Sequence, residues 1–157
     1  MRHRAGWGYS QLSQRYVDES DAAFVVPDVI ASNERAYTVF LRAIEAAQAA
    51  YLELVEILQD RFRDVPDRTL RRKLARQAAR SVLGGATETI IFVTANARAL
   101  RHFIELRGDV HADTEIRKVA LEILRIMQRE APSIFGDYRI ERLPDGTEVA
   151  RTDHRKV

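Results

Sequence analysis

The chain has 157 residues, with 25 Lys and Arg against 23 Asp and Glu, and this length fits a single domain over residues 1–157. It has no cysteine, which excludes disulfides, thiolate metal ligands and a cysteine nucleophile, and its net charge of +2 is too small to indicate nucleic-acid binding. No apolar run approaches the roughly 18 residues that span a bilayer, and no signal peptide follows Met1, so we expect a cytoplasmic protein without a membrane partner.

The first part of the chain is expected to hold one long helix. Residues 1–31 show little hydrophobic periodicity, and residues 24–27 are expected to be extended because the residue before a proline disfavours helix. From residue 34 to about residue 60, apolar side chains recur every three or four residues, which is typical of an amphipathic helix. Ser32 or Asn33 is expected to cap its amino end.

The middle of the chain predicts a basic helix followed by a strand. Residues 67–83 follow a proline and carry a run of arginines, and the two glycines at 84–85 are expected to end this helix. The β-branched and aromatic residues within 87–94 predict a strand. Asn96 is a suitable cap for a further helix that reaches Arg107.

The last part of the chain predicts a helix and a hairpin. Residues 113–130 carry apolar side chains on one face, and Pro132 is expected to close this helix. Residues 138–152 are expected to form a hairpin, because Asp145-Gly146 is a strong turn signal. The predicted fold class is therefore α+β: a helix-rich domain with a small β-sheet and a C-terminal hairpin.

Four arginines form a candidate anion site, namely a row of three and Arg107 at the end of a helix. Arg72, Arg76 and Arg80 are spaced four residues apart, which places them on one face of the expected helix. Guanidinium groups bind phosphate through two parallel hydrogen bonds, so this row suits a nucleotide or a phosphoester. The alternative is a solvated basic face without a ligand.

Two other candidate sites carry less weight. His111 and Glu115 are one helical turn apart and His102 lies in the preceding helix, a set that could bind a metal ion. A third ligand at a diagnostic spacing is missing, so we expect ordinary histidines and no metal. The two glycines at 84–85 lack the Lys and Ser or Thr of a phosphate-binding loop.

The amino-terminal segment is polar and cationic. Fifteen consecutive positions hold Arg2, His3, Arg4, Ser13, Arg15 and Tyr16. Such a density costs stability unless an anionic or planar ligand occupies the segment. The alternative is a flexible basic terminus.

Three stretches of the chain resemble one known family. RHRAGWGYSQLSQRYV resembles the signature of the flavin-dependent thymidylate synthases, which reads Arg-His-Arg, a spacer, Ser and then Arg-Tyr. LRRKLARQAARSVLGGATET is similar to the arginine-rich helix of that family, and VTANARALRHFIELRGDVHADTEIR to its strand-to-helix element. The actinobacterial branch is the most similar, because it shares the terminal Leu-x-Asp-Gly-Thr-Glu-Val hairpin.

The resemblance implies an activity and its cofactors. Members of this family are methyltransferases that convert dUMP to dTMP, with methylenetetrahydrofolate as the carbon donor and FAD reduced by NADPH as the hydride source. The absence of cysteine agrees with it, because the family needs no enzyme cysteine on the pyrimidine and the cofactors carry the difficult chemistry. Members are homotetramers with active sites shared between subunits.

The resemblance also implies the roles of individual residues. The residues implied to bind FAD are Arg2, His3, Arg4, Gln11, Asn96, Arg98 and His102. The residues implied to bind dUMP are Gln11, Leu12, Ser13, Gln14, Arg15, Arg80 and Arg107. Arg107 is the implied catalytic residue, since a cation at the uracil edge favours the ionised N3 form of the base. His111 and Glu115 also match motif positions, and we expect them to be structural.

The chain departs from the family pattern in three places. Eight residues separate Arg4 from Ser13, one more than in the family, and Gly84 replaces a proline. The family also has a substantial portion before the Arg-His-Arg triplet that supplies strands of the sheet. We therefore expect an N-terminally incomplete domain in which the strand at 87–94 lacks its neighbours.

These departures leave two alternatives to the enzyme. One is a truncated, non-catalytic member of the family that acts as an oligomerising or nucleotide-binding module. A weaker one is a basic helical protein that binds nucleic acid through residues 61–80, which would require strongly salt-dependent binding. We expect no nucleic-acid partner, because the net charge is small and no known docking motif is present.

Overall fold

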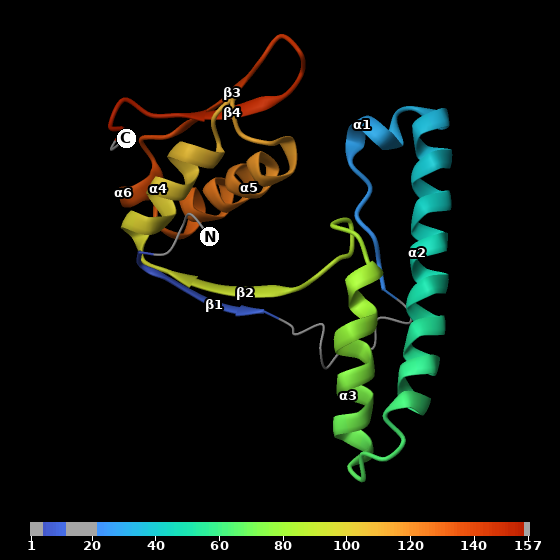
Figure 1. The fold of residues 1–157 in the computed structure, drawn as a ribbon. Helices are drawn as coiled ribbons and strands as arrows, with labels where there is room; N and C mark the ends of the chain where they lie inside the picture. Colours follow the sequence, from blue (N-terminus) through green and yellow to red (C-terminus); the bar gives the residue numbers. More distant parts are fainter. Residues whose placement is uncertain (1–4, 12–21, 156–157) are drawn as a thin grey trace. The chain divides into compact units, whose positions relative to one another are not determined.

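The computed structural model describes residues 5–11 and 22–155 (Figure 1). The chain forms two compact units, which we describe separately. One unit is Ser10–Phe92, and the other combines Met1–Tyr9 with Val93–Val157. None of the helices in the described ranges is both long enough and apolar enough to cross a membrane.

Helices α1 (Asp28–Ala31), α2 (Glu34–Arg61) and α3 (Arg68–Ala79) make up most of the first unit. Asn33 caps α2, because its side chain accepts a hydrogen bond from the Ala36 amide at 3.0 Å. Asp67 caps α3 in the same way, through the Thr69 amide at 2.8 Å. The long helix predicted over residues 34–60 is therefore confirmed, with Asn33 rather than Ser32 as its cap.

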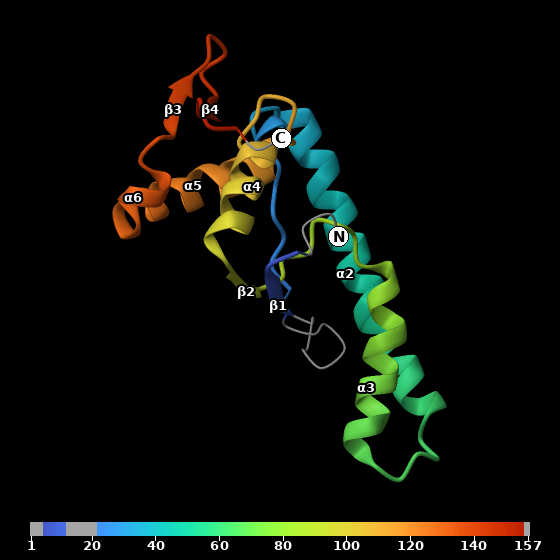
Figure 2. The ribbon, with the colours of Figure 1, turned by 90° about the vertical axis from the view of Figure 1, so that its left-hand side faces the viewer.

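Helices α2 and α3 pack side by side, and both views of the ribbon show this (Figure 2). Tyr51 of α2 is buried, as are Ala75 and Ala79 of α3. The small side chains at these positions of α3 allow the two helices to approach closely. The predicted basic helix ends at Ala79, because its last turn tightens into the 3₁₀ helix η2 (Arg80–Val82) ahead of the glycines.

The predicted strand over residues 87–94 is divided between two partners. Thr87 forms an isolated antiparallel bridge with Phe24, and the Val25 amide donates to the Ala86 carbonyl at 2.8 Å. Strand β2 itself is Ile91–Ala95 and pairs with β1 (Trp7–Gln11). The expectation that this strand lacks neighbours is therefore wrong, since a strand from within residues 1–31 lies beside it.

Aromatic packing explains why a strand forms in the glycine-rich segment. Trp7 stacks on Tyr9, the next residue on the same face of β1, with 5.8 Å between ring centroids. Trp7 also packs against Phe103 of helix α4 (Ala97–Arg107), with 5.4 Å between ring centroids. The two rings supply the apolar contacts that the neighbouring glycines lack. Two aromatic residues alone are too few to show a hydrophobic period in the sequence.

The second unit contains a helical pair covered by a hairpin. Helices α4 (Ala97–Arg107), α5 (Thr114–Glu130) and α6 (Pro132–Phe135) precede strands β3 (Arg139–Arg142) and β4 (Glu148–Arg151). Its core consists of buried apolar side chains from the three helices, from β4 and from the residue just before β3: Ile104, Leu121, Leu124, Phe135, Tyr138 and Ala150. Asn96 caps the amino end of α4, as predicted, and Asp113 caps that of α5. Pro132 begins α6 in addition to following α5, because proline is suited to the first position of a helix.

The C-terminal hairpin has the predicted position and turn. β3 and β4 are antiparallel, with Ile140 opposite Ala150, and Gly146 occupies the left-handed region at φ 83°. Asp145 supports the turn by accepting hydrogen bonds from both the amide and the hydroxyl of Thr147. The predicted class, a helix-rich α+β fold with a C-terminal hairpin, is confirmed.

Candidate functional site

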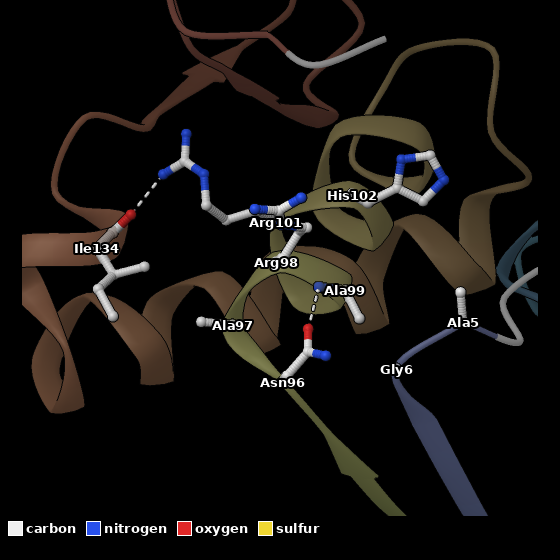
Figure 3. Close-up of a pocket in the computed structure, with 9 residues that line it drawn as sticks. All are labelled: Ala5, Gly6, Asn96, Ala97, Arg98, Ala99, Arg101, His102 and Ile134. Atoms are coloured by element: carbon white, nitrogen blue, oxygen red, sulfur yellow. Dashed lines mark hydrogen bonds between the residues drawn. The ribbon is translucent and has the colours of Figure 1, made fainter.

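A cavity of about 710 Å³ lies at the amino end of α4, within the second unit (Figure 3). Its lining comes from the start of the described chain, from α4 and from α6: Ala5, Gly6, Asn96, Ala97, Arg98, Ala99, Arg101, His102 and Ile134. The volume falls in the range of pockets that hold small molecules and cofactors, roughly 300–1,000 Å³. Three residues that the sequence predicts for FAD, namely Asn96, Arg98 and His102, therefore lie together.

Asn96 and Gly6 form one end of the cavity. The Asn96 amide donates to the Gly6 carbonyl at 3.1 Å, while the Asn96 side chain accepts from the Ala99 amide at 2.9 Å. Gly6 has a φ of +74°, and a Cβ atom added there would lie 2.5 Å from Nδ2 of Asn96. Glycine is therefore required at position 6 for both its conformation and its close approach to α4.

Two arginines line the cavity, and their environments differ. Arg101 is mostly buried and binds Asp137 through two hydrogen bonds, from Nη1 to Oδ1 at 2.5 Å and from Nη2 to Oδ2 at 2.7 Å. Its Nη1 also donates to the Ile134 carbonyl, and its guanidinium lies 4.5 Å from the centre of the Tyr138 ring. Arg98 is exposed and forms no ion pair with any residue in the described ranges.

The Arg101–Asp137 pair is part of a larger polar network. The hydrogen bonds from Arg101 hold the pKa of Asp137 well below its usual range, and the Thr152 hydroxyl, which donates to Asp137 at 2.5 Å, acts in the same direction. Burial raises the pKa of Tyr138, and the neighbouring carboxylate of Glu105 raises it further. Tyr138 therefore stays neutral and donates to the buried Glu105 at 3.1 Å.

His102 is half-buried on α4, one turn after Arg98. Figure 3 shows its ring on the side of Ala5, whereas the Arg101 guanidinium lies toward Ile134. The cavity wall therefore offers an imidazole at one side and a neutralised arginine at the other. The amino end of α4 lies between them, with backbone amides that favour negative charge.

Arg107, the predicted catalytic residue, is half-buried and is the last residue of α4. It is not among the residues that line the cavity at the opposite end of the helix. The loop that follows it is held by β4: the Ala150 amide donates to the Gly108 carbonyl at 2.8 Å, and Arg151 donates to Asp109 at 3.0 Å.

The contacts of Asp109 stabilise its ionised form. Burial favours a higher pKa for its carboxyl group, but the hydrogen bond from the His111 amide and the charge of Arg151 outweigh this effect. The pKa of Asp109 consequently lies below its usual value. The loop after Arg107 thus carries a fixed negative charge that holds the hairpin.

Two further predicted residues belong to the first unit. Gln11 is exposed at the end of β1, and its amide donates to the Thr89 hydroxyl at 3.3 Å. Arg80 begins η2, is exposed, and forms no ion pair with another described residue. In the row to which it belongs, Arg72 is exposed and Arg76 is half-buried.

Several predicted residues lie outside the described ranges. These are the FAD candidates Arg2, His3 and Arg4 and the dUMP candidates Leu12, Ser13, Gln14 and Arg15. Within the described ranges, no group of three His, Asp or Glu side chains is placed to hold a metal ion.

Sequence reasoning missed Arg101 and Asp137. Arg101 follows Arg98 by three positions, so the two lie next to each other on the surface of the helix. This spacing could have indicated that Arg101 lies near the same site. Nothing local identifies Asp137 as the partner, because it lies 36 residues further along the chain.

Comparisons with known proteins agree with the motifs. The family model described as thymidylate synthase complementing protein matches residues 1–133. Relatives named flavin-dependent thymidylate synthase are 53% identical over 150 residues in Mycobacteroides abscessus and Mycolicibacterium vanbaalenii, and 51% identical in Mycobacterium tuberculosis. Each match covers 96% of this chain and 60% of the relative, so the chain spans about 60% of the length of these proteins. The predicted resemblance is therefore confirmed, and the chain belongs to the thymidylate synthase complementing protein family, that of the flavin-dependent thymidylate synthases.

Proposed function

We propose that this protein acts as a flavin-dependent thymidylate synthase. It methylates dUMP to dTMP, taking the carbon from methylenetetrahydrofolate and the hydride from FAD that NADPH has reduced. Family membership supports this proposal, as does the name of the relatives that are 51–53% identical. We further propose that both compact units belong to one domain of this family.

One observation carries the proposal. Ala5 and Gly6, which directly follow the Arg2-His3-Arg4 triplet in the sequence, line the same cavity as Asn96, Arg98 and His102. Two of the three motif segments, separated by about half of the chain, thus contribute to one concave site. This is the arrangement expected if both segments hold a single cofactor.

The residues present fit a flavin dinucleotide. Arg98 supplies a cation without an ion pair among the described residues, and the amino end of α4 supplies a partial positive charge, so both suit phosphate. Ala97 and Ala99 supply small apolar surface against which a planar ring can lie. When bound, the flavin supplies the hydride, and the protein binds and orients it.

The chain's own residues are proposed to act on dUMP. Arg107 places a cation at the uracil edge and favours the N3-deprotonated base, which reacts more readily with an electrophilic carbon. Arg80 and Arg15 neutralise the phosphate, and Ser13 donates a hydrogen bond. The remaining residues of the loop, Gln11, Leu12 and Gln14, enclose the nucleotide.

We propose that the protein works as a homotetramer in the cytoplasm. Apolar side chains on α2 support self-association, because Val39, Leu52 and Ile57 are 46–55% exposed. The proposed assembly would bury these side chains and bring together residues from different subunits.

A second candidate function is a non-catalytic, nucleotide-binding or oligomerising member of the family. The observation that favours it is the altered loop, in which eight residues instead of the family's seven separate Arg4 from Ser13. It predicts that dUMP binding is weak or absent and that no dTMP is formed.

Turnover distinguishes the two. The purified 157-residue protein is incubated anaerobically with dUMP, methylenetetrahydrofolate, NADPH and FAD, and dTMP is quantified by chromatography. Formation of dTMP that requires all four components supports the enzyme and eliminates the non-catalytic module. Absence of dTMP from a folded protein that also fails to bind dUMP contradicts the proposed function.

A further inference from the structure

We propose that Asp137 determines how much positive charge the α4 cavity presents to its ligand, by neutralising Arg101 and leaving Arg98 as the arginine that meets phosphate. This inference rests on the proposed function, because it concerns the same cavity. It assigns a role to a residue that lies outside the family's motif segments.

The geometry separates the two arginines. Arg101 makes two hydrogen bonds to Asp137 at 2.5 and 2.7 Å, and its side chain is 15% exposed. The parallel pair of bonds is the strongest arrangement between a guanidinium and a carboxylate. Arg98, one turn earlier on α4, is exposed and makes no such pair within the described residues.

Asp137 is itself held in place. The Thr152 hydroxyl donates to its Oδ2 at 2.5 Å, and its side chain is 25% exposed. These contacts, with the hydrogen bonds from Arg101, keep the Asp137 carboxylate ionised, as the lowering of its pKa indicates. The negative charge opposite Arg101 is therefore permanent at neutral pH.

Arg101 keeps its position without the charge of Asp137. Its Nη1 donates to the Ile134 carbonyl and its guanidinium lies over the Tyr138 ring, 4.5 Å from the centroid. In an Asp137→Asn variant, these contacts and one amide oxygen remain. The variant consequently retains the shape of the cavity wall but adds one uncompensated positive charge to it.

The charge role and a purely structural role predict different results. Asp137→Asn is expected to tighten binding of a phosphate-bearing ligand about threefold to tenfold at low ionic strength, with a steeper salt dependence. Arg101→Gln leaves Asp137 uncompensated and is expected to weaken the same binding. A purely structural role predicts that both variants weaken binding and leave the salt dependence unchanged.

The test uses two probes on the full chain. FAD binding is followed by flavin fluorescence, and inorganic pyrophosphate binding by the backbone NMR signals of Ala97, Arg98 and Ala99, each at several sodium chloride concentrations. The proteins are the parent, Asp137→Asn, Arg101→Gln and the double variant. The double variant, which lacks both charges, is expected to return the salt dependence to that of the parent.

The two probes separate this inference from the proposed function. Pyrophosphate binding without FAD binding would contradict the flavin function. The salt dependence of pyrophosphate binding would still compare the charge of the cavity between the variants. Steeper salt dependence in Asp137→Asn supports the inference. An unchanged salt dependence in that variant, or a parent that binds neither probe, overturns it.

Discussion

The backbone amide of Asn96 donates to the carbonyl oxygen of Gly6 at 3.1 Å, and this bond joins the residue just before β1 to the amino end of α4. The same asparagine caps α4 through its side chain. One residue thus sets both the beginning of the helix and the end of the cavity that the helix lines. Changes at Gly6 are expected to act through Asn96.

Gly6→Ala is expected to destabilise the protein by about 1–3 kcal/mol, because φ at this position is +74° and the new methyl group would meet Nδ2 of Asn96 at 2.5 Å. Urea unfolding followed by circular dichroism measures the loss. Gly8→Ala is the matched control, since a Cβ there meets nothing closer than 3.9 Å. Equal stability of the two variants would contradict the close approach of Gly6 to the Asn96 side chain.

Gly108→Ala is expected to cost about 1–3 kcal/mol through overpacking. Its Cβ would lie 2.7 Å from the Ile104 carbonyl and 2.8 Å from the Ala150 side chain, where the loop after Arg107 meets β4. Gly84→Ala provides the comparison, because nothing lies within 4 Å of a Cβ at that position. Differential scanning calorimetry should show a lower Tm for the first variant only.

Arg107→Ala and Arg80→Ala are each expected to weaken dUMP binding about tenfold or more, since each would remove a charged hydrogen-bond donor from the nucleotide site. Isothermal titration of dUMP into each variant measures the change. Arg68→Ala is the control, because Arg68 is an exposed arginine at the start of α3 with no proposed role. If both variants bound dUMP as the parent does, the proposed roles of the two arginines would be wrong.

Asp137→Asn is expected to lower stability by about 2 kcal/mol at pH 7, because it leaves the mostly buried Arg101 without its carboxylate. The pKa of Asp137 is lowered in the folded state, so its contribution is complete above the unfolded value of about 3.9 and is lost as pH falls below it. The free energy of unfolding should therefore fall less steeply with acid in the variant than in the parent.

Asp153→Asn is the control for this pH dependence. Asp153 pairs with Arg139 at the surface, where both side chains are more than half exposed, so its loss is expected to change stability little. Urea titrations between pH 2 and pH 7 compare the three proteins. Parallel pH profiles for the parent and Asp137→Asn would contradict the role of the Arg101–Asp137 pair.

The features predicted from the sequence are those with local causes. Helix α2 follows from its apolar spacing, α4 from the cap at Asn96, and the hairpin turn from Asp145-Gly146. Each of these features depends on residues within a few positions of one another, so the local sequence is enough to predict it.

The features that were missed depend on residues far apart in the chain. β1 forms because Trp7 packs on Phe103, and Arg101 pairs with Asp137 across 36 positions. Residue propensities and local spacing do not predict such long-range contacts. In the candidate site, the motif resemblance named Asn96, Arg98 and His102, which line the cavity, but it gave no indication of Arg101 or of its partner Asp137.

The visible absorption spectrum of the purified chain with FAD, recorded with and without dUMP, tests the central claim most directly. We predict a bound-flavin spectrum that shifts on addition of dUMP, with FAD affinity at least about tenfold weaker in Arg98→Ala because a charged donor to phosphate is lost. Arg129→Ala, an exposed arginine in the last turn of α5, should behave as the parent does. A folded parent without bound flavin, or an Arg98→Ala variant with unchanged affinity, would contradict the assignment of the α4 cavity to FAD.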